Sequence, residues 1–311
     1  LVAGQSAYGL GQYEKARVHL AAYLAQNPQD EQARMVLGAT MLRLGRPKQA
    51  YGTLTALPHG DIPDDTNYLN VLTSAAFGMG DKEAGTKYLE QLAAKEPGNA
   101  AIQERLGVAR QSQGDVAGAQ AALERAIASE PDRLSAYTHL FVVQLNQKQL
   151  DEALDVAQRI QSRFADKAIG DTLLGIAYLT KGQRNEARQA FQNALDKEPG
   201  NAEAAGNLAN ILVIDGRIDD ARKVLDGVLK TNPGHQRTLL ASAELAVRAC
   251  DEAGAEALWR RAVESDHKAR QPRILLGNYL IKTNRAAEAL ALTEPALARE
   301  PKSLGLLETV G

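Results

Sequence analysis

The chain has 311 residues, of which 44% are hydrophobic and 5% aromatic, and its formal net charge at pH 7 is -2. This near-neutral balance provides no overall electrostatic attraction for DNA or RNA. No apolar run reaches the ~18 to 20 residues that a membrane-spanning helix needs. Cys250 is the only cysteine, which excludes a disulfide within the chain.

In chain order, the predicted elements are short helices that come in pairs. Second helices are predicted to begin near Tyr13, Pro47, Asp81, Asp115, Asp151, Arg184, Ile218, Asp251 and Arg285. First helices are predicted to start after Asp30, Asp65, Asn99, Arg133, Lys167, Asn201, His235, Ala269 and Ser303. A proline, which ends a helix because it lacks the backbone donor, recurs about every 34 residues, at Pro28, Pro63, Pro97, Pro131, Pro199, Pro233 and Pro301.

Aligned on this period, the rows share three columns of related residues. A column that stays small, as expected where two helices cross closely, holds Ala16, Ala50, Gly85, Ala119, Ala153, Ala187, Ala221, Ala255 and Ala289. A second column, small except at Phe141, is where a neighbouring helix is expected to pack: Gly4, Gly38, Thr73, Gly107, Phe141, Gly175, Ala209, Ala243 and Gly277. A turn column that requires a left-handed residue holds Gly11, Gly45, Gly80, Gly114, Lys148, Gly182, Gly216, Cys250 and Asn284.

The rows resemble the tetratricopeptide repeat (TPR), whose pattern is nearly complete in Leu174, Gly175, Tyr178, Ala187, Phe191, Ala194 and Pro199. The resemblance implies an all-α fold, a right-handed TPR superhelical solenoid. We expect a single continuous TPR array over residues 1–311, with about eight full repeats and a partial repeat at each end. Because neither end shows a polar capping repeat, we expect this chain to be a fragment of a longer one.

The residues that carry chemistry in other proteins do not converge here. The five histidines, His19, His59, His139, His235 and His267, fall in unrelated columns, and no metal-binding spacing occurs. The sequence therefore predicts no enzyme, no cofactor and no metal site in this segment. Trp259 is expected in the core and Cys250 in a turn.

In a right-handed TPR superhelix the first helices line a concave groove. The six residues predicted to bind a partner there are Asn207, Asn210, Glu244, Arg248, Asn278 and Lys282. Asn210, Glu244 and Asn278 occupy one column in consecutive repeats, so they could form a ladder of donors and acceptors for an extended peptide or a polar chain. The alternative is that these residues are simply solvated in an empty groove.

Departures from the pattern cluster in residues 134–167 and 236–269, where closing prolines are missing and Phe141 and Lys148 replace small or turn residues. These rows could bend the superhelix, face a partner, or reflect drift at tolerant positions.

The second half also resembles one lineage, the TPR-repeat lipoproteins found with exosortase and PEP-CTERM sorting systems in Gram-negative exopolysaccharide loci. The resemblance lies in residues 174–179, 207–209, 239–246, 248, 251–253, 259, 262–263, 272–276 and 279–280. It implies a non-catalytic, protein-binding scaffold in exopolysaccharide export or protein sorting, with a protein, peptide or polysaccharide partner. It also implies a periplasmic location at the outer membrane, through an N-terminal lipid anchor absent from this chain.

Two alternatives remain open. The chain could be a generic cytoplasmic TPR adaptor that binds a peptide, or the substrate-docking arm of a glycosyltransferase.

Overall fold

The computed structural model describes residues 1–57, 60–266 and 268–298. Within these residues the chain forms eighteen α-helices and no strand, which confirms the predicted all-α class. None of the described helices combines the length and apolar character needed to cross a bilayer. The chain divides into two compact units, unit 1 (Leu1–Gln149) and unit 2 (Leu150–Gly311). One continuous array over residues 1–311 therefore stays a prediction.

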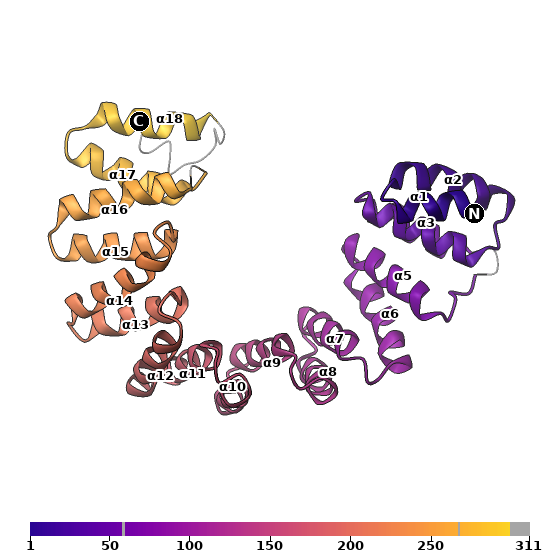
Figure 1. The fold of residues 1–311 in the computed structure, drawn as a ribbon, viewed down its shortest axis with the longest axis horizontal. Helices are drawn as coiled ribbons and strands as arrows, with labels where there is room; N and C mark the ends of the chain where they lie inside the picture. The colour runs from indigo at the N-terminus through magenta and orange to yellow at the C-terminus, as the bar shows by residue number, and fades with distance from the viewer. Residues whose placement is uncertain (58–59, 267, 299–311) are drawn as a thin grey trace. The chain divides into compact units, whose positions relative to one another are not determined.

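Each unit consists of consecutive helices that run back and forth (Figure 1). Unit 1 holds α1 Val2–Gly9, α2 Tyr13–Gln26, α3 Glu31–Arg43, α4 Pro47–Thr55, α5 Thr66–Gly78, α6 Lys82–Lys95, α7 Ala100–Ser112, α8 Val116–Ser129 and α9 Leu134–Asn146. Unit 2 holds α10 Leu150–Arg163, α11 Ile169–Thr180, α12 Arg184–Lys197, α13 Ala202–Ile214, α14 Ile218–Thr231, α15 Gln236–Arg248, α16 Glu252–Ser265, α17 Arg270–Lys282 and α18 Ala286–Leu297. Odd-numbered helices are the first helices of the predicted pairs.

Helix starts follow the predicted capping residues. The side chain of Asp30 accepts a hydrogen bond from the backbone N–H of Ala33 at 2.8 Å, and Asp65 does the same for Tyr68. Such bonds satisfy N–H groups that have no partner inside the helix. The clearest shift is at α11, which begins at Ile169, one residue later than predicted. Predictions that involve His59, His267, Pro301 and Ser303 lie outside the described residues.

The turn column adopts the left-handed conformation in all nine rows. Its six glycines have φ between 70° and 89°, and the three other residues are Lys148 (59°), Cys250 (57°) and Asn284 (59°). This confirms that the turn requires a positive φ whichever residue occupies it, even though a Cβ makes that conformation less favourable. Cys250 is therefore a turn residue, as predicted.

The two small columns let the helices of a pair approach closely. Every alanine of the first column is fully buried. In the second column, a Cβ on Gly38 would lie 2.8 Å from Leu54 Cγ, and a Cβ on Gly175 would lie 2.5 Å from Phe191 Cε1. The helix that packs against this column is thus the second helix of the same pair. Large residues on the second helix fill the space that small residues on the first helix leave.

Two large aromatic residues also belong to the core. Trp259 is 9% exposed and its ring lies 5.5 Å from that of Tyr279, as its predicted core position requires. Phe141, the exception in the second small column, is 1% exposed. The interpretation that this departure faces a partner is therefore wrong for Phe141, because its side chain has no surface to offer.

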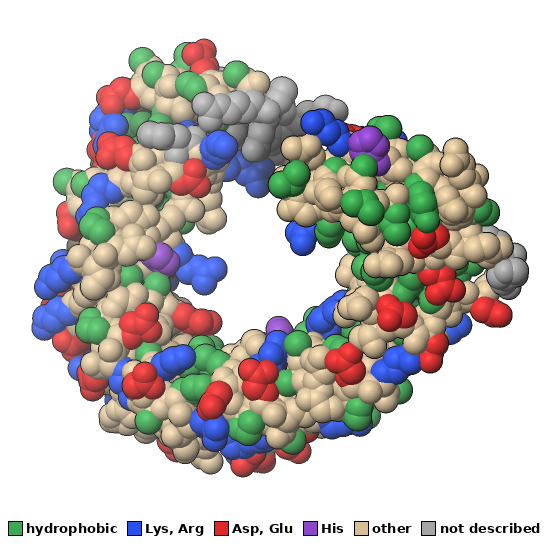
Figure 2. Space-filling model, turned by 45° about the vertical axis from the view of Figure 1, so that its right-hand side comes forward, with side chains coloured by type: hydrophobic (Ala, Val, Ile, Leu, Met, Phe, Trp, Pro, Cys, Tyr) green, Lys and Arg blue, Asp and Glu red, His purple; other side chains and the backbone are tan. Residues whose placement is uncertain are grey.

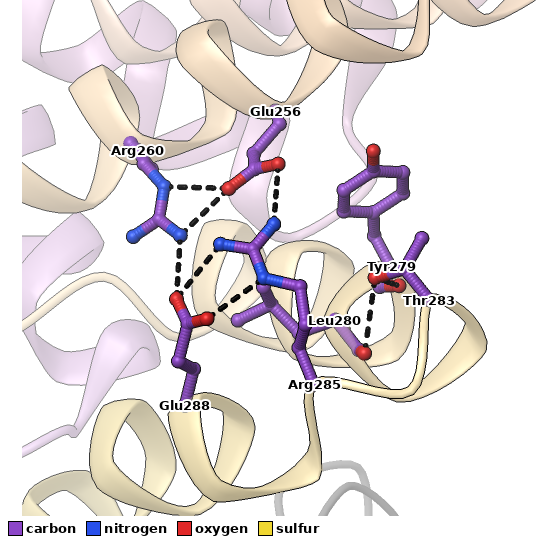
Figure 3. Close-up of polar contacts among 7 residues, drawn as sticks. All are labelled: Glu256, Arg260, Tyr279, Leu280, Thr283, Arg285 and Glu288. Carbon is purple, nitrogen blue, oxygen red and sulfur yellow. Dashed lines mark hydrogen bonds and ion pairs between the residues drawn. The ribbon is translucent and has the colours of Figure 1, made fainter.

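Four charged side chains join the last helices of unit 2 (Figure 3). Arg285, in the turn before α18, contacts Glu256 of α16 at 2.8 Å and Glu288 of α18 at 2.7 Å. Arg260 of α16 bridges the same two carboxylates, at 2.6 and 3.1 Å. The hydrogen bonds from Arg285 lower the pKa of Glu288 to about 2, from an ordinary 4.5. The network thus favours the ionised form of Glu288.

This network makes the stability of the α16–α18 segment depend on pH. Because the pKa of Glu288 is lower in the folded state, its contribution is fully present above about pH 4.5 and is lost as the pH falls through about 2. We therefore expect the difference in melting temperature between wild type and Glu288→Gln to be largest above pH 4.5 and to vanish near pH 2. Glu294→Gln is the control, because Glu294 of α18 is exposed and forms no ion pair with the described residues. A constant difference across this range would contradict the prediction.

Candidate partner-binding surface

A hollow in unit 1 lies over α7, and we call it the α7 pocket. Its volume is about 530 Å³, within the range of roughly 300 to 1,000 Å³ that ligand sites occupy. One wall comes from Phe77 at the end of α5, Gly80 in the turn before α6 and Lys82, the first residue of α6. The other wall comes from Arg133, the N-cap of α9, and from His139 within that helix.

The floor of the α7 pocket is one face of α7. It is formed by Ala101, Glu104, Arg105, Val108, Ala109 and Ser112, spaced three and four residues apart. This spacing places the six side chains on one side of a helix. Val108 is 38% exposed although it is aliphatic, and Phe77 is half-buried. The centre of the pocket is therefore apolar and accessible.

A buried carboxylate, Glu104, holds the wall on the α9 side. Glu104 is 8% exposed, pairs with Arg133 and lies 3.0 Å from Nδ1 of His139. Burial alone would raise the pKa of Glu104, but hydrogen bonds from Arg133 and Ser135 outweigh it and lower the pKa below its ordinary value. Arg133 also pairs with Glu130 at 2.8 Å. Glu104 is therefore ionised at neutral pH and its charge is balanced within the protein.

The remaining charges of the α7 pocket are positive. Arg105 donates to the side-chain oxygen of Asn70 at 2.9 Å, which is a neutral partner. Desolvation lowers the pKa of Arg105, but the guanidinium stays charged at neutral pH. Within the described part of the chain, neither Lys82 nor Arg105 forms an ion pair. The pocket thus carries two positive charges, and none of the carboxylates among the described residues pairs with them.

In unit 2 the structure brings together three of the six residues predicted to bind a partner. Asn210, Glu244 and Arg248 line a hollow of about 50 Å³ between α13 and α15. Glu244 forms an ion pair with Arg248, one turn later on α15, at 2.8 Å. The hydrogen bonds described for Glu244 are therefore made along its own helix.

The other three predicted residues do not line that hollow. Asn207 of α13 donates to the backbone carbonyl of Glu203 at 2.9 Å, within its own helix. Asn278 and Lys282 are exposed on α17. The predicted ladder of Asn210, Glu244 and Asn278 stays a prediction.

A metal site and a surface of one charge sign would be two further signs of function. Among the described residues no group of three or more His, Cys, Asp or Glu side chains could hold a metal ion. On the face shown in Figure 2, acidic and basic side chains are mixed. Hydrophobic side chains gather over the N-terminal helices of unit 1, where Leu10 is 73% and Val18 53% exposed.

Comparison with protein families identifies the repeat. A tetratricopeptide repeat model matches residues 7–74, 110–175, 178–243 and 212–278, and a second model of the same repeat matches residues 72–119. Together these matches cover far more than half of the chain. The chain belongs to the tetratricopeptide repeat family. A TPR array is a scaffold for protein–protein interaction, and the fold is in general not catalytic.

Solved TPR structures are similar to this chain in fold. The C-terminal part of a TPR protein from Cytophaga hutchinsonii has a TM-score of 0.56 and 14% identity, covering 76% of this chain and 97% of its own. A TPR protein from Parabacteroides merdae has a TM-score of 0.50 and 15% identity, and the match covers 79% of this chain and 97% of that protein's chain. PilF of Pseudomonas aeruginosa has a TM-score of 0.50 and 16% identity, and the match covers 68% of this chain and 96% of the PilF chain. No curated protein sequence matches the chain.

The TPR register also shows what the sequence reasoning missed. Val108 lies in the same repeat column as Asn210, Glu244 and Asn278, and Arg105 and His139 lie in the column of Asn207. The prediction named residues of these columns only in unit 2. The signal for the α7 pocket was the pair of basic residues, Arg105 and His139, in the Asn207 column of two consecutive repeats.

Proposed function

We propose that this TPR array binds an extended segment of a partner protein on its first helices, and that the α7 pocket is the main contact in unit 1. The single observation that supports this is the accessible apolar floor at Val108, walled by Phe77 and by the Glu104–Arg133 pair. Apolar side chains exposed in a concave site mark binding surfaces. In unit 2, the proposed contact is the set Asn207, Asn210, Glu244, Arg248, Asn278 and Lys282.

Site-specific cross-linking tests the proposal. A photo-reactive amino acid is placed at Val108, on the pocket floor, and in a second variant at Ala121, an exposed position on α8 outside the pocket. We expect partner proteins to be captured at Val108 and not at Ala121. Unlabelled wild type should compete for this capture, whereas the Val108→Glu variant should not. Equal capture from both positions would contradict the proposal.

We further propose a cellular role in exopolysaccharide export or PEP-CTERM protein sorting at the Gram-negative envelope. The support is the resemblance within residues 174–280, which also implies a periplasmic, outer-membrane-associated protein held by an N-terminal lipid anchor outside this chain. A cytoplasmic peptide-binding adaptor and the docking arm of a glycosyltransferase are the competing roles. Co-purification of the full-length protein with envelope fractions supports the envelope role, and recovery with cytosolic partners alone contradicts it.

A further inference from the structure

The charges around the α7 pocket favour partner segments that carry negative charge. Of the described residues that line it, Glu104 alone carries a carboxylate, and Arg133 and His139 already contact that carboxylate. Lys82 lies on the opposite wall and Arg105 on the floor, both with exposed side chains. An approaching basic segment would meet like charges, whereas an acidic one would find two unpaired cations.

The apolar part of the α7 pocket adds a second requirement. Phe77, Ala101, Val108 and Ala109 supply the apolar lining, and the pocket is about 530 Å³ in volume. A partner segment that carries only charged side chains would leave this apolar lining exposed to water, so binding would gain no hydrophobic free energy. An apolar side chain of the partner that packs on Val108 would bury the lining. The partner segment therefore needs both acidic residues and an apolar residue.

We propose, as a refinement that rests on the proposed function, that the α7 pocket recognises an acidic extended peptide in which a bulky apolar residue is flanked by Asp or Glu. The apolar side chain occupies the floor between Phe77 and Val108. The flanking carboxylates pair with Lys82 and Arg105. Glu104 and Arg133 hold the wall on the α9 side in place and do not contact the charged residues of the peptide.

Fluorescence anisotropy with synthetic peptides on the whole chain tests this assignment. The probe is a labelled peptide with one leucine between two pairs of glutamates. The comparison peptides replace the leucine with glycine, or all the glutamates with lysine. We expect the leucine–glutamate peptide to bind at least about tenfold more tightly than either comparison peptide, and its affinity to fall with added salt.

Matched charge variants locate the binding. Lys82→Glu combined with Arg105→Glu is expected to weaken the leucine–glutamate peptide by about tenfold or more, and Val108→Glu by a similar factor. Lys87→Glu on α6 and Val18→Glu on α2 are the controls, since both positions are exposed on second helices and lie outside the pocket lining. These controls should change the affinity by no more than about twofold. Unchanged melting temperatures show that each variant is folded.

Four results would overturn the assignment. The lysine peptide could bind as tightly as the leucine–glutamate peptide, or the glycine peptide could. Polygalacturonate, an anionic polysaccharide without apolar side chains, could bind as tightly as the leucine–glutamate peptide. The control variants could weaken binding as much as the pocket variants. If cross-linking at Val108 still captures a partner and the charge reversals leave that capture unchanged, the refinement fails while the proposed function stands. If Val108 captures nothing, the proposed function itself fails.

Discussion

Replacing Gly175 with alanine is expected to destabilise unit 2 by about 1 to 3 kcal/mol, although helix propensity favours alanine. The reason is the close approach of α11 and α12. The new Cβ would lie 2.5 Å from Cε1 and 2.6 Å from Cδ1 of Phe191, which is fully buried, so the ring or the helix would have to shift. The measurement is the free energy of unfolding from urea denaturation followed by circular dichroism.

The chain offers a control and a rescue for this substitution. Gly206 of α13 has no atom within 4 Å of an added Cβ, so Gly206→Ala should be neutral or stabilising by up to about 1 kcal/mol. In the next pair, buried Ala209 and Leu225 occupy the positions of Gly175 and Phe191. Gly175→Ala combined with Phe191→Leu should therefore cost less than the sum of the two single changes. Additive costs would show that the two positions are not coupled.

The turns and the packing columns were predictable because each depends on a local backbone requirement that recurs in every repeat. A residue after the first helix must adopt a positive φ, so Lys148, Cys250 and Asn284 could be assigned to the turn although they are not glycine. The burial of Trp259 was predictable because it lies four residues after Ala255 of the small column, on the inner face of the second helix. Phe141 shows the limit, because a column position does not say whether an oversized residue points into the core or out of it.

The α7 pocket was harder to predict because its walls depend on side chains from three helices. Glu104 pairs with Arg133, 29 residues later, and Phe77 reaches the same space from α5. A repeat period predicts which columns lie on the same face of a helix. The depth of a hollow depends instead on the size and rotamer of each side chain that lines it. The sequence favoured the polar column of unit 2, where Glu244 pairs with Arg248 and the hollow is only about 50 Å³.

Removing Lys197 is expected to destabilise unit 2 more than removing its buried partner, Asp171. Asp171 of α11 is 1% exposed and is bound by Lys197 of α12 at 2.6 Å and by the amide of Gln161 at 2.6 Å. Lys197→Ala leaves the buried carboxylate without its cation, which should lower the free energy of unfolding by about 3 kcal/mol. Urea denaturation of the whole chain measures this loss.

Asp171→Leu should cost less than about 1 kcal/mol, because it removes the buried charge and lets the ammonium of Lys197, which is 29% exposed, return to water. Leu239, buried in α15, already occupies the corresponding position of a later repeat. Lys181→Ala is the matched control, since its partner Asp151 is 81% exposed and the pair should be worth no more than about 1 kcal/mol. Equal losses from Asp171→Leu and Lys197→Ala would mean that the pair itself, and not the unpaired buried charge, determines the cost.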